Sequence, residues 1–132
     1  MEDPSALAGA TAYDMPLTGM PPVNLLLTGT HGVIREVLGK LLRAVEGPIA
    51  AWYPGERLVL PQDPRAGTMI LHEVGFLGYG EQLQLLEWLE DGVGRTQIVS
   101  TTSTPLMPRV EAGTFSDVLY YRLNTVTVDV TA

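Results

Sequence analysis

The feature that most constrains the fold of this chain is an alternation of short apolar runs with longer amphipathic stretches. Residues 23–28 are almost wholly apolar, as expected of a parallel strand that is covered on both faces. After the turn at residues 29–32, apolar side chains recur at three- and four-residue spacing up to Val45, which predicts an amphipathic helix. This order of elements favours a parallel sheet flanked by helices.

The same alternation continues to the end of the chain. Strands are predicted at residues 49–53, 68–71, 96–101 and 125–130, helices at residues 81–91, 107–112 and 116–123, and a short extended piece at residues 58–60. In the last strand, valines at every second position are typical of a half-covered strand near a sheet edge. For the helix at 81–91 we expect an apolar face made by Leu83, Leu85, Leu86, Trp88 and Leu89, with Gln82, Gln84, Glu87 and Glu90 facing solvent.

These elements fit one domain. Residues 1–22 hold four prolines and two glycines, and we expect a loose N-terminal arm there. Residues 23–132 are expected to form an α/β core. The predicted architecture is a three-layer sandwich, in which a mostly parallel five-stranded sheet carries helices on both faces.

Composition excludes several function classes. The chain has 8 Lys and Arg against 15 Asp and Glu, and it has no basic cluster, so we expect no direct nucleic-acid binding. It has no cysteine, which removes disulfides and thiol chemistry. No apolar run approaches the roughly 18 residues needed to span a bilayer. The acidic N-terminus lacks the basic start of a secretion signal, and we expect a bacterial cytoplasmic protein.

Three segments carry a resemblance to a known family. Residues 67–75 read GTMILHEVG, residues 83–92 read LQLLEWLEDG, and residues 111–124 read EAGTFSDVLYYRLN. In this order they resemble the AAA+ ATPase domain of sigma-54-dependent transcription activators. The resemblance extends over residues 23–130 and implies a P-loop NTPase fold.

The resemblance places a degenerate phosphate loop at residues 29–36. A phosphate loop needs glycines, so that backbone N–H groups can close around phosphate oxygens, and a lysine that reaches the terminal phosphates. The first and inner glycines of the family fall on Gly29 and Gly32, and the glutamate that follows the lysine falls on Glu36. The lysine itself falls on Arg35, and the last glycine is replaced by Ile34. One interpretation is weak binding of ATP or ADP, and the other is a tight strand-to-helix turn without a ligand.

The acidic pair of the family's Walker B strand falls on His72 and Glu73. In the family the first carboxylate holds magnesium through water and the second polarises the attacking water. Imidazole is a poor substitute for an oxygen ligand of magnesium. Glu73 keeps the chemistry of a general base, but hydrolysis of ATP is not expected without a positioned metal.

A third hypothesis concerns a transition metal. In the resembling fold, the phosphate loop and the Walker B strand end at the same edge of the sheet. His31 and His72 could therefore meet Glu73 there and bind an ion such as zinc. The alternative is that two unrelated polar residues fill an emptied pocket.

Further family positions also differ. The asparagine that senses the terminal phosphate falls on Ser103, and the arginine after it falls on Thr104. Of the two arginines that reach into a neighbouring subunit, the first falls on Ser116 and the second is kept as Arg122. We expect Arg122 to act in packing or hydrogen bonding. The GAFTGA loop of the family is absent between residues 36 and 72, and the helical lid that would follow residue 130 is absent as well.

The sequence therefore predicts a non-hydrolysing regulatory or protein-interaction module, derived from a sigma-54 activator ATPase domain. The alternative is a residual ATP- or ADP-binding domain that senses nucleotide without turning it over. Enzymatic activity is not expected, and no cofactor is required by the first hypothesis. We expect a protein partner, from the transcription machinery or a regulator, and a monomer or a dimer.

Overall fold

The computed structural model describes residues 23–45, 47–62, 67–91 and 96–130. The predicted arm at residues 1–22 lies outside the described residues. The elements follow one another in the order β1 (Leu25–Thr28), α2 (His31–Ala44), β2 (Ile49–Trp52), β3 (Thr68–Leu71), the 3-10 helix η1 (Val74–Phe76), α3 (Tyr79–Asp91), β4 (Gln97–Thr102), α4 (Met107–Glu111), α5 (Asp117–Leu123) and β5 (Val126–Asp129).

The strands form one sheet in the order β2-β3-β4-β1-β5, and every neighbouring pair is parallel. The predicted fold class is thus confirmed, and the sheet is wholly parallel where the sequence predicted a mostly parallel one. The pairing register aligns Leu71 with Ser100 and Thr28 with Thr102, so the strands end at a common carboxyl edge. β5 lies at an edge of the sheet, as the valine alternation predicted.

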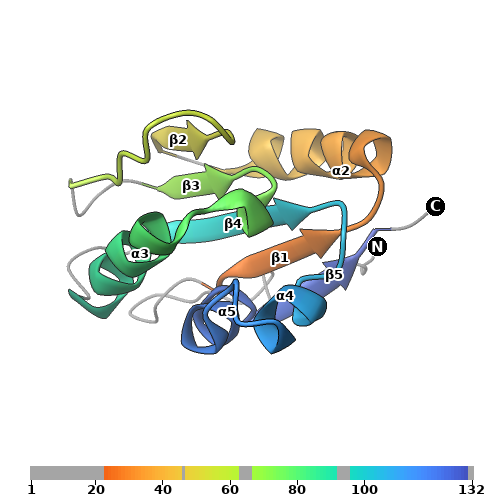
Figure 1. The fold of residues 1–132 in the computed structure, drawn as a ribbon. Helices are drawn as coiled ribbons and strands as arrows, with labels where there is room; N and C mark the ends of the chain where they lie inside the picture. The colour runs from red at the N-terminus through yellow and green to blue at the C-terminus, as the bar shows by residue number, and fades with distance from the viewer. Residues whose placement is uncertain (1–22, 46, 63–66, 92–95, 131–132) are drawn as a thin grey trace.

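Helices cover both faces of the sheet. Successive side chains of a strand point to opposite faces, so each strand contributes side chains to the core on both sides. On one face, Leu38 of α2 packs in a cluster with Leu27, Ile70 and Val99. On the other face, α3 and α5 pack against the larger core cluster, which includes Leu26, Met69 and Ile98. Figure 1 shows α3, α4 and α5 in front of the sheet and α2 behind it. Within the described residues, no helix is long and apolar enough to cross a membrane.

Most predicted elements are present, with shifted ends. Helix α2 begins at His31, two residues before the predicted start, and α3 begins at Tyr79 in place of residue 81. Residues 58–60 do not form a strand, but Leu58 and Leu60 are buried in the larger core cluster beneath α3. Side chains of α3 hold this segment, since Gln84 and Trp88 donate hydrogen bonds to the carbonyls of Leu58 and Pro61.

Each predicted face of α3 is wrong at one position. Gln82 is buried at 5% exposure, and Leu83 is exposed at 45%. Leu85 is fully buried, as predicted. The reason is that the amide of Gln82 makes three hydrogen bonds to backbone groups, which offset the cost of burying it.

The centre of β4 offers a test of the core. Ser100 is fully buried, and its Oγ has no hydrogen-bond partner among the described residues. A buried hydroxyl without a partner costs about 1–3 kcal/mol. We therefore expect Ser100→Ala to raise the free energy of unfolding by about 1 kcal/mol, measured as a higher urea midpoint at an unchanged m-value.

The matched control is the next residue. Thr101 is also buried, but its Oγ1 accepts a hydrogen bond from the backbone N–H of Glu73. Thr101→Val keeps the shape and removes the acceptor, so we expect it to lower the urea midpoint. A lower midpoint for Ser100→Ala as well would contradict the assignment of an unsatisfied hydroxyl.

Candidate functional site

The candidate site lies at the carboxyl edge of the sheet, where β1, β3 and β4 end next to one another. The residues that follow these strands are Gly29, His72 with Glu73, and Ser103. Parallel α/β sheets bind ligands at this edge, since the helix that follows each strand starts there. The geometry of these residues decides what chemistry the edge supports.

The turn between β1 and α2 is short. Only Gly29 and Thr30 separate the end of β1 from His31, the first residue of α2. Gly29 has a φ of 154°, and an added Cβ would lie 2.8 Å from Cγ2 of Val130. The need for glycine at position 29 is thus explained by the close approach of the chain beyond β5.

The other predicted phosphate-loop residues lie within α2. Gly32 is in the first turn of the helix, and Arg35 and Glu36 are on its exposed surface. The backbone N–H of Ile34 donates to the carbonyl of Thr30 at 2.9 Å, and the Ile34 side chain is buried at 5% exposure. The Cβ of an alanine at position 32 would meet no atom within 4 Å, so packing does not explain that glycine.

Glu73 lies at the centre of the site and is held by three groups. Its backbone is left-handed, with φ 48° and ψ 61°, and its N–H donates to Oγ1 of Thr101 at 3.0 Å. Its Oε1 accepts a hydrogen bond from the backbone N–H of Ser103 at 3.1 Å, and its Oε2 lies 3.3 Å from Nδ1 of His31. Glu73 therefore joins the ends of β3 and β4 to the start of α2.

His72 points to a different neighbour. Its ring stacks on Tyr53, with the ring centroids 4.1 Å apart and the planes 6° from parallel. Burial lowers the pKa of His72 below the usual histidine value, although the charges of Glu73 and Glu56 act in the opposite direction. The described residues contain no group of three or more His, Cys, Asp or Glu side chains that could hold a metal ion. Of the residues predicted to bind a metal, His31 lies next to Glu73, whereas His72 stacks on Tyr53.

Arg122 lies at the opposite end of the sheet. Its Nη2 donates to the carbonyl of Leu89 at 3.1 Å, and its Nη1 lies 3.8 Å from Oε2 of Glu90, so it contacts the last turn of α3. Its own carbonyl accepts a hydrogen bond from Asn24, which directly precedes β1. A cation beside the final carbonyls of a helix is favourable. Within this chain Arg122 cannot act on the same group as Glu73.

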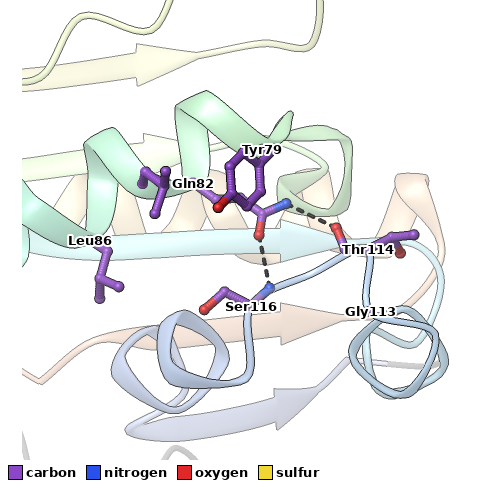
Figure 2. Close-up of a pocket in the computed structure, with 7 residues that line it drawn as sticks. Tyr79, Gln82, Leu86, Gly113, Thr114 and Ser116 are labelled. Carbon is purple, nitrogen blue, oxygen red and sulfur yellow. Dashed lines mark hydrogen bonds between the residues drawn. The ribbon is translucent and has the colours of Figure 1, made fainter.

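Sequence reasoning missed a second feature, a small pocket beside α3. Figure 2 shows Gln82 extending from α3 to the backbone of Thr114 and Ser116. The pocket has a volume of about 80 Å³, and its lining includes Tyr79, Leu83 and Leu86. No local signal predicts it, because the partners of Gln82 are backbone groups 32 and 34 residues further along the chain.

Solved structures of other proteins share the fold of this chain. NtrX from Brucella abortus, in the crystal structures with ADP and with ATP, aligns with a TM-score of 0.67 and 22% identity. The alignments cover 83% and 85% of this chain and 32% of NtrX. The P-loop NTPase domain of a sigma-54 transport activator from E. coli aligns with a TM-score of 0.59 and 17% identity, over 83% of this chain and 84% of that domain. The fold is that of an AAA+ P-loop NTPase core.

The family is defined more narrowly by sequence. The family model of the sigma-54 interaction domain matches residues 18–132, and the chain belongs to this family. The resemblance inferred from the three sequence segments is thereby confirmed. The HTH-type transcriptional regulatory protein TyrR of Citrobacter braakii is 28% identical over 97 residues, as is TyrR of Salmonella typhimurium. The match covers 65% of this chain but only 19% of TyrR.

The lowered pKa of His72 predicts a pH-dependent stability. The unfolded chain binds a proton near pH 6.5, at a higher pH than the native state does. The stability contributed by neutral His72 is therefore complete above that pH and is lost as the pH falls through the native pKa. We expect the urea midpoint to drop between about pH 7.5 and pH 5, and an NMR titration to place the His72 pKa below 6.5. His72→Phe keeps an aromatic ring and should show a weaker pH dependence, and a native pKa above 6.5 would contradict the analysis.

The role of Glu73 can be tested by two substitutions. Glu73→Ala leaves the backbone N–H of Ser103 without its acceptor, and we expect a loss of about 1–3 kcal/mol in unfolding free energy by urea denaturation. Glu73→Gln keeps an oxygen for that bond and should lose less. Equal losses in the two variants would show that the bond to Ser103 contributes nothing measurable.

Proposed function

We propose that this chain is a non-hydrolysing regulatory or protein-interaction module that retains the fold of a sigma-54 activator ATPase domain. The fold by itself does not assign an activity, because function depends on the site that a fold carries. The proposal therefore rests on the contacts made at the carboxyl edge of the sheet.

The observation that carries the proposal is the engagement of Glu73. Both of its carboxylate oxygens have partners within the chain, at 3.1 Å to the Ser103 N–H and at 3.3 Å to His31. A general base must reach the water that it activates. The two partners fix the direction of the Glu73 carboxylate, and its side chain is only 17% exposed, so access of a water to its remaining lone pairs is restricted.

The short turn after β1 supports the same conclusion. A phosphate cradle is built from successive loop N–H groups that converge on one anion. Here α2 begins at His31, and the N–H of Ile34 is already bonded within the helix. Arg35 lies on the exposed surface of α2, one residue after the buried Ile34.

The position of the metal-binding carboxylate gives a third argument. His72 occupies it, and a magnesium ion prefers oxygen ligands. The imidazole stacks on Tyr53, and the lowered pKa reflects its partial burial. Under this proposal, the His72 ring takes no part in phosphoryl transfer.

A second candidate function is the sensing of ATP or ADP without hydrolysis. It is favoured by Gly32, whose lack of a side chain is not explained by any neighbouring atom. Gly32 lies in the first turn of α2, where free backbone N–H groups and the helix dipole favour an anion. NtrX, which shares the fold, is described in complex with ADP and with ATP.

Thermal denaturation with ligands separates the two functions. A ligand that binds only the native state raises the melting temperature. With magnesium and ATP or ADP at a concentration of roughly 1 mM, we expect no rise in melting temperature and no phosphate release above the protein-free rate. A rise with either nucleotide would favour the sensing function, and phosphate release would contradict the proposal. A rise with zinc that is lost in His72→Ala would support the metal hypothesis instead.

Gly32→Ala is the matched variant for this experiment. Alanine is favoured over glycine within a helix by up to about 1 kcal/mol, and the added Cβ meets no atom. We expect the variant to melt at a higher temperature than the parent, with the same response to nucleotide. If the parent binds nucleotide at the start of α2, the variant should instead lose that response.

A further inference from the structure

The surface of α3 presents apolar side chains that the core does not use. Leu83 is 45% exposed and Tyr79, one turn earlier, is 80% exposed. Leu86 follows one turn after Leu83 and is partly buried. Residues at this spacing lie on one side of a helix. Together they form a stripe beside the pocket of about 80 Å³ that Thr114 and Ser116 close on its other side.

The stripe is held in place by Gln82. Its amide nitrogen donates to the carbonyls of Leu77 at 2.9 Å and Thr114 at 3.0 Å, and its oxygen accepts from the backbone N–H of Ser116 at 2.8 Å. These bonds join α3 to the segment between α4 and α5, as Figure 2 shows. The rotation of α3 that exposes Leu83 is therefore fixed by bonds from a buried side chain.

The charges around the stripe are acidic. Exposed Glu87 lies one turn after Leu83 on α3, and exposed Asp117 directly follows Ser116. The arginines of α4 and α5 already have partners within the chain. Arg109 lies over the ring of Phe76, and Arg122 contacts the end of α3. A partner of complementary charge must carry Lys or Arg beside its apolar side chains.

We propose that this α3 groove, formed by Tyr79, Leu83 and Leu86 with Thr114 and Ser116, binds a basic amphipathic helix of a partner protein. The apolar side of that helix packs on the stripe, and its lysines or arginines face Glu87 and Asp117. Helix-in-groove binding uses apolar anchors at three- and four-residue spacing, which matches the stripe. The inference rests on the proposed function as an interaction module and names the partner's chemistry.

Two other occupants match the charges poorly. A second copy of this chain carries a net charge of −7, and the same acidic groove would face itself in a symmetric dimer. Residues 1–22 of this chain contain Glu2, Asp3 and Asp14 and no Lys or Arg. Like charges that face each other across an interface oppose association.

The test uses the full chain and a synthetic amphipathic helix of leucine and lysine, roughly 18 residues long so that it spans several turns. Binding is measured by calorimetry, and its location by backbone NMR shifts. We expect the shifted signals to lie in α3 and in residues 113–118. A peptide with glutamate in place of lysine should not bind, and added salt should weaken the lysine peptide.

Leu83→Glu is the deciding variant. It adds a negative charge, so non-specific attraction of a basic peptide predicts tighter binding. Docking in the groove predicts binding weaker by about tenfold or more, because an anchor is lost. Val59→Glu is the matched control, since Val59 is also exposed, at 66%, and lies outside the groove. It should bind the peptide as the parent does.

Several results would overturn the proposal. These are the absence of binding, equal affinity in Leu83→Glu, and shifts confined to other elements. If the parent forms a dimer that Leu83→Glu abolishes, the occupant of the groove is a second copy of the chain. If the NMR signals of residues 1–22 shift in Leu83→Glu without peptide, the occupant is the N-terminal arm. None of these results bears on ATP hydrolysis. Phosphate release remains the separate test of the proposed function.

Discussion

Parallel pairing of β3, β4 and β1 is the constraint on which the site depends. The register sets the ends of these strands side by side, so residues far apart in sequence become neighbours at the carboxyl edge. Glu73 after β3, Ser103 after β4 and His31 after β1 meet for this reason alone. The sheet brings these residues together, and the chemistry of their side chains determines what the site can do.

The fold was predictable because its core strands read as apolar runs. All four residues of β3 are buried, and β1 is apolar on both faces, which is the pattern of a strand with helices above and below. The alternating valines of β5 likewise identified an edge strand. The pattern of apolar residues within one strand predicts whether one or both of its faces are buried, without knowledge of the rest of the chain.

The details of the site were not predictable in the same way. The burial of Gln82 could not be predicted from helical spacing. Its three backbone partners lie in the turns before α3 and after α4. The early start of α2 at His31 was missed because Gly29 and Gly32 were interpreted as parts of one loop. The residues of the candidate site were identified from the family resemblance, but their contacts with one another depend on side-chain geometry. Arg122 was expected in hydrogen bonding, and the structure places it on the last turn of α3.

The burial of Ile34 has a practical consequence. The sequence resemblance aligned this residue with a loop glycine of the family, and its side chain is part of the interior at 5% exposure. Removing a buried isoleucine side chain typically costs about 2–5 kcal/mol, a large share of the stability of a small domain. A single substitution by glycine would thus weaken the protein without lengthening the turn that precedes α2. Position 34 therefore couples the start of α2 to the stability of the whole domain, and a change made to the turn for a functional test must leave this side chain in place.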